Sequence, residues 1–150
     1  MKRIYLIALA AILLTTAASA QRPVRFRNET VDTTRITTAL IELDKAKKST
    51  PQLLVIEAGK MFISTPYAAG TLEESPEMLT VDTEHLDCTT FVEMATAMAI
   101  TVANRRTSWH DYVYNLQQLR YRGGNVDGYA SRLHYISDWI IDNNHRGNLR

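Results

Sequence analysis

The stretch Leu86-Asp87-Cys88-Thr89-Thr90-Phe91-Val92-Glu93 opens the segment that decides the fold. Asp87 is a good helix N-cap, and from Phe91 onward apolar residues recur at helical spacing, at positions 91, 95, 98 and 102. Further apolar residues widen this row, as expected of a helix that is buried on most sides. The sequence therefore predicts a central helix from Cys88 to about Asn104, with Cys88 in its first turn.

Cys88 is the only cysteine of the chain. In the first turn of a helix, unpaired backbone N–H groups and the positive end of the helix dipole favour thiolate over thiol. The position therefore suits a nucleophile. Two alternatives stay open: a small hydrophobic residue packed in the core, and a disulfide between two copies, which a central helix makes less favourable.

Residues 1–20 have the pattern of a cleavable signal peptide. A basic start at Lys2 and Arg3 precedes an apolar stretch over 4–14, and the small residues Ala18-Ser19-Ala20 form a cleavage site. The apolar stretch is shorter than the roughly 20 residues that span a bilayer. We therefore expect cleavage after Ala20 and a periplasmic or secreted protein that does not contact the membrane afterwards. An uncleaved membrane anchor is the alternative.

The expected mature chain is nearly neutral. Cleavage removes two of the 17 basic residues and none of the 16 acidic ones, which leaves a net charge of −1. Such a chain lacks the excess of basic residues that binding to nucleic acid requires. Its histidines and single cysteine also lack the spacing of metal ligands. We expect no nucleic-acid partner, no metal and no cofactor in what is one modest domain.

Two helices are expected between the signal and the cysteine helix. Residues 21–30 are polar and weakly patterned, which predicts an extended arm before a helical domain over 31–150. An apolar stripe at helical spacing predicts a helix capped by Asp32 or Thr33 that runs to about Lys47.

The second of these helices begins at Thr50 and Pro51, a capping residue followed by a proline at the first helical position, and runs to about Phe62. A long acidic connection follows, which we interpret as a solvated loop from Glu73 to Glu84. One short strand is predicted within this loop, at residues 78–81.

Two more helices are expected after the cysteine helix. Ser108 resembles the start of a capping box for a helix that ends at Gly123-Gly124. Ser131 is expected to cap a last helix with Leu133, Ile136 and Ile140 on its inward face. The sequence as a whole therefore predicts an all-α fold of four to five helices.

Five segments of the chain carry a family resemblance: Gly59-Lys60, TPYAAGTLE at 65–73, LDCTTFVE at 86–93, RYRG at 120–123 and SRLHYISDWI at 131–140. In this order they resemble the DUF1460 family of N-acetylmuramoyl-L-alanine amidase-like proteins. The segment around the cysteine is also similar to the wider NlpC/P60 superfamily of papain-like cysteine hydrolases. The resemblance spans nearly the whole mature chain and implies the helical subdomain of a papain-like hydrolase, lacking its downstream β half.

The resemblance implies hydrolysis of the amide between N-acetylmuramic acid and L-alanine in peptidoglycan fragments, the muropeptides. Cys88 would attack the carbonyl carbon and form an acyl-enzyme that water then cleaves. Tyr67, Asp87 and Thr89 would lie near the nucleophile. Backbone N–H groups at the helix start, including that of Cys88, would help to hold the developing oxyanion.

A thiol nucleophile also needs a neighbouring imidazole. In the family this histidine comes from the β half, and no strand-rich segment with a histidine follows residue 140, so we expect a truncated chain that is inactive alone. Among the resident histidines, His85 lies three residues before Cys88 and could approach it from the loop. His134 is the better placed, because Asp138 would follow it by one helical turn and could orient its ring.

The alternative for His134 is a structural role, in which the pairing with Asp138 only satisfies the ring in a helix interface. We therefore assign Arg132, His134 and Asp138 to the substrate cleft. A non-catalytic function also stays open: an exported helical module that binds muropeptides or a partner protein, with Cys88 in its core. Reaction of the native thiol with a labelling reagent would separate this module from an enzyme.

Overall fold

The computed structural model describes residues 24–45 and 50–149, so the predicted signal peptide lies outside the described residues. Their elements are, in chain order, β1 (Val24–Phe26), α2 (Glu29–Lys45), α3 (Pro51–Lys60), β2 (Leu79–Val81), α4 (Cys88–Ala103), α5 (Trp109–Arg120), the 3₁₀ turns η1 (Arg122–Gly124) and η2 (Tyr129–Ser131), and α6 (Ile136–His145). The described part of the chain is mostly helical, with five α-helices where an all-α fold of four to five was predicted, but it also contains a small sheet. No helix in these ranges is both long and apolar enough to cross a membrane.

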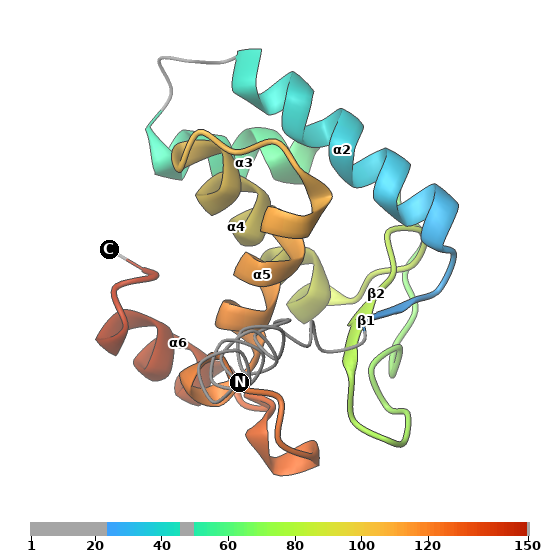
Figure 1. The fold of residues 1–150 in the computed structure, drawn as a ribbon, viewed down its shortest axis with the longest axis vertical. Coiled ribbons are helices and arrows are strands. Elements are labelled where there is room, and N and C mark those ends of the chain that lie inside the picture. The colour runs from blue at the N-terminus through green and yellow to red at the C-terminus, as the bar shows by residue number, and fades with distance from the viewer. Residues whose placement is uncertain (1–23, 46–49, 150) are drawn as a thin grey trace, which may run out of the picture.

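Helix α4 is the central element. It packs against α3, α5 and α2 (Figure 1), and ten of its 16 residues are buried. Its start is fixed by a capping box: the Asp87 carboxylate accepts a hydrogen bond from the Thr90 amide at 2.7 Å, and the Thr90 hydroxyl accepts one from the Asp87 amide at 2.9 Å. The predicted helix, its cap and the position of Cys88 in its first turn are therefore confirmed.

The hydrophobic core lies on both sides of α4. The stripe predicted for α2, at Ile36, Leu40 and Leu43, is fully buried. Helices α3 and α4 approach each other closely at Gly59, where an added Cβ would lie 3.3 Å from the Phe91 ring. Glycine at this position therefore allows the two helices to pack at short range.

The sheet joins two distant parts of the chain. Strand β1 pairs in parallel with β2, and Val24 lies opposite Leu79 while Phe26 lies opposite Val81. The strand predicted over 78–81 is therefore confirmed. Its partner comes from the arm at 21–30, where only an extended conformation was expected.

Helix α2 begins at Glu29, earlier than predicted, and Asp32 is not its N-cap. The Asp32 side chain is fully buried in the first turn of the helix. Its Oδ1 accepts hydrogen bonds from the backbone amide of Thr83 at 2.8 Å and from the Thr83 hydroxyl at 2.7 Å. The carboxylate therefore ties α2 to the loop after β2, a long-range contact that local sequence patterns do not reveal.

Helix α5 ends at Arg120, and not at Gly123-Gly124 as predicted. Its C-cap, Tyr121, is extended and forms an antiparallel bridge with Arg132. The amide of Leu133 donates to the Arg120 carbonyl at 2.9 Å beside this bridge. Pairing with a distant backbone segment thus ends the helix before the glycines are reached.

Helix α6 also begins later than predicted, at Ile136, and Ser131 does not cap it. The Ser131 hydroxyl instead donates to the Gly128 carbonyl at 2.7 Å and closes the turn η2. The inward face of α6 carries Trp139 and Asn143.

The prediction that Ile136 and Ile140 face inward is therefore wrong, since their side chains are 62% and 50% exposed. The reason is the polar Asn143, whose side-chain amide donates to the carbonyls of Leu119 and Trp139, both at 2.9 Å. These bonds turn the asparagine, and not the isoleucines, toward α5.

Candidate active site

Cys88 is exposed at the N-terminus of α4. Its thiol forms no hydrogen bond with any of the described residues. The preceding loop is fastened beside it, because the amide of Leu86 donates to the Pro66 carbonyl at 3.1 Å and the amide of Ala68 donates to the Leu86 carbonyl at 3.2 Å. The backbone of Tyr67 thus lies beside Leu86, the residue two positions before Cys88. The Tyr67 side chain is exposed.

A polar pocket of about 180 Å³ adjoins this helix start. Asp87 and Thr89, the two neighbours of Cys88, form part of its wall. The other lining residues are Gly70, Leu72, Glu73, Glu93, Arg120, Arg132, Leu133 and His134. The pocket therefore brings together four residues predicted for the site from the sequence (Asp87, Thr89, Arg132 and His134), while Tyr67, Cys88 and Asp138 do not line it.

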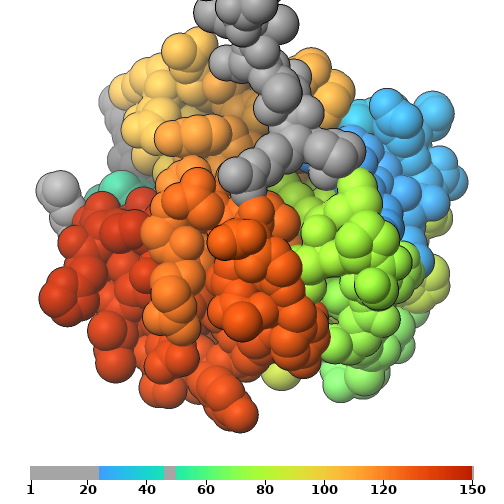
Figure 2. Space-filling model, turned by 60° about the horizontal axis from the view of Figure 1, so that its bottom comes forward, coloured from blue at the N-terminus to red at the C-terminus, as the bar shows by residue number. Residues whose placement is uncertain are grey.

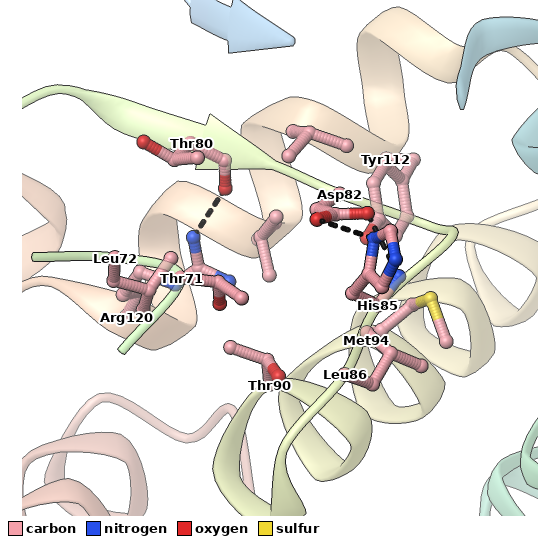
Figure 3. Close-up of a pocket in the computed structure, with 12 residues that line it drawn as sticks. Thr71, Leu72, Thr80, Asp82, His85, Leu86, Thr90, Met94, Tyr112 and Arg120 are labelled. Atoms are coloured by element: carbon pink, nitrogen blue, oxygen red, sulfur yellow. Dashed lines mark hydrogen bonds and ion pairs between the residues drawn. The ribbon is translucent and has the colours of Figure 1, made fainter. Parts of the chain in front are cut away.

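A buried ion pair forms one wall of the pocket. Arg120 Nε donates to Glu93 Oε2 at 2.7 Å, and Arg120 Nη1 donates to the Thr80 carbonyl at 2.5 Å, a contact that Figure 3 shows from the side of a smaller cavity. Burial disfavours the charged guanidinium, but the adjacent Glu93 carboxylate outweighs this effect and raises the pKa of Arg120. The guanidinium of this wall is therefore held in place and charged.

Arg132 also lines the pocket and is only 7% exposed. Its Nη2 donates to Glu73 Oε1 at 2.9 Å, and its Nε lies 3.2 Å from Glu77 Oε1. Its guanidinium also lies over the Tyr129 ring, 5.2 Å from the ring centroid. Figure 2 shows the corresponding surface, where the segment around residues 125–135, in orange, lies against the green loop at 70–80.

Glu77 in turn accepts a hydrogen bond from the Tyr121 hydroxyl at 2.7 Å. Burial and this hydrogen bond raise the pKa of Tyr121. The acidic loop, which the sequence suggested was only solvated, is therefore anchored. Glu73 and Glu77 pair with Arg132, and Glu74 pairs with Arg25 and Arg27.

His134 reaches the pocket, but not in the predicted arrangement. Its Nε2 lies 2.9 Å from the Tyr129 carbonyl oxygen. Because a carbonyl only accepts hydrogen bonds, Nε2 is the donor in this contact. The predicted pair with Asp138 is wrong: α6 begins only at Ile136, and Asp138 pairs with Arg122 at 3.4 Å.

The other described histidines do not form a hydrogen bond or ion pair with Cys88 either. His85 lies 3.5 Å from the Asp82 carboxylate and lines a cavity of about 10 Å³ (Figure 3), to which Cys88 does not contribute. His110 stacks on Trp109, with ring centroids 3.5 Å apart. Within residues 24–45 and 50–149, no group of three or more His, Cys, Asp or Glu side chains could hold a metal ion.

Sequence reasoning missed three charged residues of the pocket: Glu73, Glu93 and Arg120. A signal was present for Glu93, because it is the only charged side chain in α4. A single charge in a buried helix is costly unless it is paired, so it indicates a buried partner. No comparable local signal pointed to Arg120 as that partner.

Comparisons with known proteins show which family the chain resembles. A family model described as AmiA-like, N-acetylmuramoyl-L-alanine amidase-like, matches residues 57–150. An N-acetylmuramoyl-L-alanine amidase from Bacteroides uniformis has 39% identity and a TM-score of 0.62 over 66% of this chain and 42% of its own. A protein from Bacteroides fragilis named a "putative xylanase" has 49% identity and a TM-score of 0.58 over 61% of this chain and 40% of its own.

A more distant relative shares the fold. A DUF1460 protein from Legionella pneumophila has 21% identity and a TM-score of 0.61 over 80% of this chain and 40% of its own. The chain thus spans only about two fifths of the length of these solved structures. No curated protein is significantly similar to it.

Proposed function

Because the chain belongs to the AmiA-like family of N-acetylmuramoyl-L-alanine amidase-like proteins, we propose that it is the cysteine-bearing part of a peptidoglycan amidase. The bond cleaved is the amide between N-acetylmuramic acid and L-alanine in muropeptides. One observation carries the proposal: the exposed Cys88 thiol lies at the N-terminus of a buried helix, and its two neighbours line a polar pocket of about 180 Å³.

In the proposed reaction, Cys88 attacks the carbonyl carbon of the lactyl group as a thiolate. The C–N bond breaks, the L-alanine nitrogen leaves with a proton as an amine, and a thioester remains on Cys88. Water then attacks the thioester and releases the free acid of N-acetylmuramic acid. Each step passes through a tetrahedral intermediate whose oxygen carries negative charge.

Two backbone amides are available to stabilise that oxygen. At the start of α4, the amide of Thr90 donates to the Asp87 side chain and that of Phe91 to the Asp87 carbonyl. The amides of Cys88 and Thr89 have no acceptor among the described residues. They are therefore candidate donors for an oxyanion beside the thiol.

The proposal includes a catalytic base from outside the described part of the chain. None of the four histidines bonds to Cys88, and the chain spans about two fifths of the length of its solved relatives. We propose that it corresponds to the helical half of a papain-like hydrolase, and that a complementary half supplies the imidazole. Cleavage after Ala20 and a periplasmic or secreted location would bring the protein to its substrate.

The test is turnover of purified muropeptides, followed by mass spectrometry. The chain alone should leave them intact, and a longer form that carries the complementary half should release the sugar and the L-alanine peptide. Cys88→Ala in the longer form should abolish release, while Cys88→Ala and wild type should fold alike. Intact muropeptides after incubation with the longer wild-type form would contradict the proposal.

The second candidate is a non-catalytic module that binds muropeptides or a partner protein. It is favoured by the finding that no described histidine forms a hydrogen bond with Cys88. It predicts binding without cleavage in both forms of the protein. The exposed thiol argues against it, because this candidate placed Cys88 in the core.

A further inference from the structure

In the pocket, an arginine forms an ion pair with a carboxylate of the loop between α3 and β2. Glu73 accepts a hydrogen bond from Arg132 Nη2 at 2.9 Å, and both residues line the pocket. We propose that Arg132 binds a carboxylate in the peptide part of the substrate, and that Glu73 competes for the same guanidinium. This inference rests on the proposed function, because it assigns to Arg132 the binding of one part of the proposed substrate in the same pocket.

Arg132 is held in position from several directions. Its backbone forms the bridge with Tyr121, and its neighbour Leu133 donates to the Arg120 carbonyl. The side chain is 93% buried, covered by the Tyr129 ring on one face and by Glu77 behind it. A guanidinium fixed in this way loses little entropy when it binds a ligand.

The same guanidinium has hydrogen-bonding capacity left over. It carries five N–H donors, and among the described residues only its Nη2 makes a hydrogen bond. The buried Nε has no hydrogen-bond acceptor, although Glu77 Oε1 lies 3.2 Å away. An arginine with unused donors at a pocket wall is suited to a planar carboxylate, which accepts two parallel hydrogen bonds.

The other charges of the pocket are already engaged. Glu93 and Arg120 pair with each other in the interior, and Asp87 caps α4 through Thr90. The pair between Glu73 and Arg132 differs, because the Glu73 side chain is 52% exposed. Exposed carboxylates contribute little net stability to an ion pair, so a carboxylate from a ligand can replace this one at low cost.

The position of the pocket indicates which part of the substrate carries that carboxylate. Asp87 and Thr89 flank Cys88, so a group in the pocket lies close to the bond under attack. On the sugar side of that bond a muropeptide offers hydroxyl and acetamido groups, whereas its peptide side offers carboxylates. The chemistry of Arg132 therefore selects an acidic peptide.

The experiment measures binding of three probes to the full chain by NMR titration. They are N-acetylmuramoyl-L-alanyl-D-glutamate, the same compound with both carboxylates converted to amides, and N-acetyl-D-glutamate, which lacks the sugar. The diacid should bind at least tenfold more tightly than the diamide. Arg132→Lys, which keeps the charge but loses the planar fork, should weaken binding of the diacid about tenfold.

The most specific variant is Glu73→Gln, which removes the competing carboxylate from an exposed position. It should strengthen binding of the diacid several-fold and leave the diamide unchanged. Glu74→Gln is the matched control, because Glu74 pairs with Arg25 and Arg27 and does not line the pocket. A purely structural role of the pair predicts no gain for Glu73→Gln.

The outcomes separate this inference from the proposed function. Equal binding of diacid and diamide, or weaker binding of the diacid by Glu73→Gln, would overturn the carboxylate site and leave muropeptide binding intact. Binding of N-acetyl-D-glutamate alone, lost in Arg132→Lys, would support the site and count against muropeptides as the substrate. Binding of no probe would overturn both.

Discussion

The guanidinium of Arg120 and the carboxylate of Glu93 lie 2.7 Å apart with side chains that are only 4% and 2% exposed. Glu93 lies in the second turn of α4 and Arg120 ends α5, while the Thr80 carbonyl of β2 takes a second N–H of the guanidinium. The pair thus joins three elements at the wall of the pocket.

Removal of Arg120 should be one of the most destabilising single changes in the chain. Arg120→Met leaves the Glu93 carboxylate buried without a counter-charge, which costs about 3–5 kcal/mol of unfolding free energy. Urea denaturation followed by circular dichroism measures this loss. The control Arg122→Met, whose ion pair with Asp138 is exposed, should change stability by less than about 0.5 kcal/mol. Similar losses in the two variants would contradict this account of the pair.

The buried contact between Asp32 and Thr83 should be nearly as sensitive. Asp32→Ala leaves the amide and hydroxyl of Thr83 without their acceptor, at a cost of about 2–3 kcal/mol. Thr83→Val removes one of the two hydrogen bonds and should cost about 1 kcal/mol. The losses in the double variant should not add, because the partners are shared. Asp44→Asn, on the same helix and with no side-chain hydrogen bond to any described residue, serves as the control, and strictly additive losses would argue against a direct contact.

The Cys88 thiol should react in the native protein. Because it is exposed, iodoacetamide should modify it completely without denaturant, and mass spectrometry should show one adduct per chain. Cys88→Ser, which removes the only sulfhydryl, is the control. A thiol that reacts only after unfolding would place the sulfur in the core and would remove the basis for a nucleophile.

Stability should fall at alkaline pH through the buried Tyr112. Burial raises the pKa of Tyr112, with the nearby Arg120 opposing the shift only in part. Above pH 10, where an unfolded tyrosine loses its proton and the folded one keeps it, the unfolded state binds fewer protons. Unfolding free energy therefore decreases as pH rises, by about 1.4 kcal/mol per pH unit for this group.

Tyr112→Phe should flatten that alkaline slope while keeping the ring in the core. The control is Tyr114→Phe, whose side chain is 64% exposed and which should leave the slope unchanged. Urea titrations between about pH 9 and 11 supply the measurement. An identical slope in wild type and Tyr112→Phe would show that another group causes the alkaline loss.

The parts of the fold that could be predicted are those with local causes. Helix α4 follows from its own apolar spacing and from Asp87, a cap that bonds to a residue three positions away. The errors arose where distant segments pair. Strand β1 depends on β2, and the bridge between Tyr121 and Arg132 ends α5 early and delays α6.

The same distinction applies to the site. The sequence predicted Asp87 and Thr89 near the nucleophile and Arg132 and His134 in the substrate cleft, and the pocket brings these four together. The expected pair of His134 with Asp138 assumed a helix capped by Ser131, whereas the observed cap of α6 is Tyr135. Glu73 was missed because its partner lies 59 residues away in the chain, beyond any local pattern.

The parallel pairing of β1 with β2 also has a kinetic consequence. Val24 meets Leu79, so this pair closes a loop that contains α2 and α3. Closing a long loop costs chain entropy before the strand contacts can form, whereas the hydrogen bonds of a helix form between residues close in the sequence. The N-terminal strand should therefore attach late during folding, and it should be the first segment to detach when the protein is stressed.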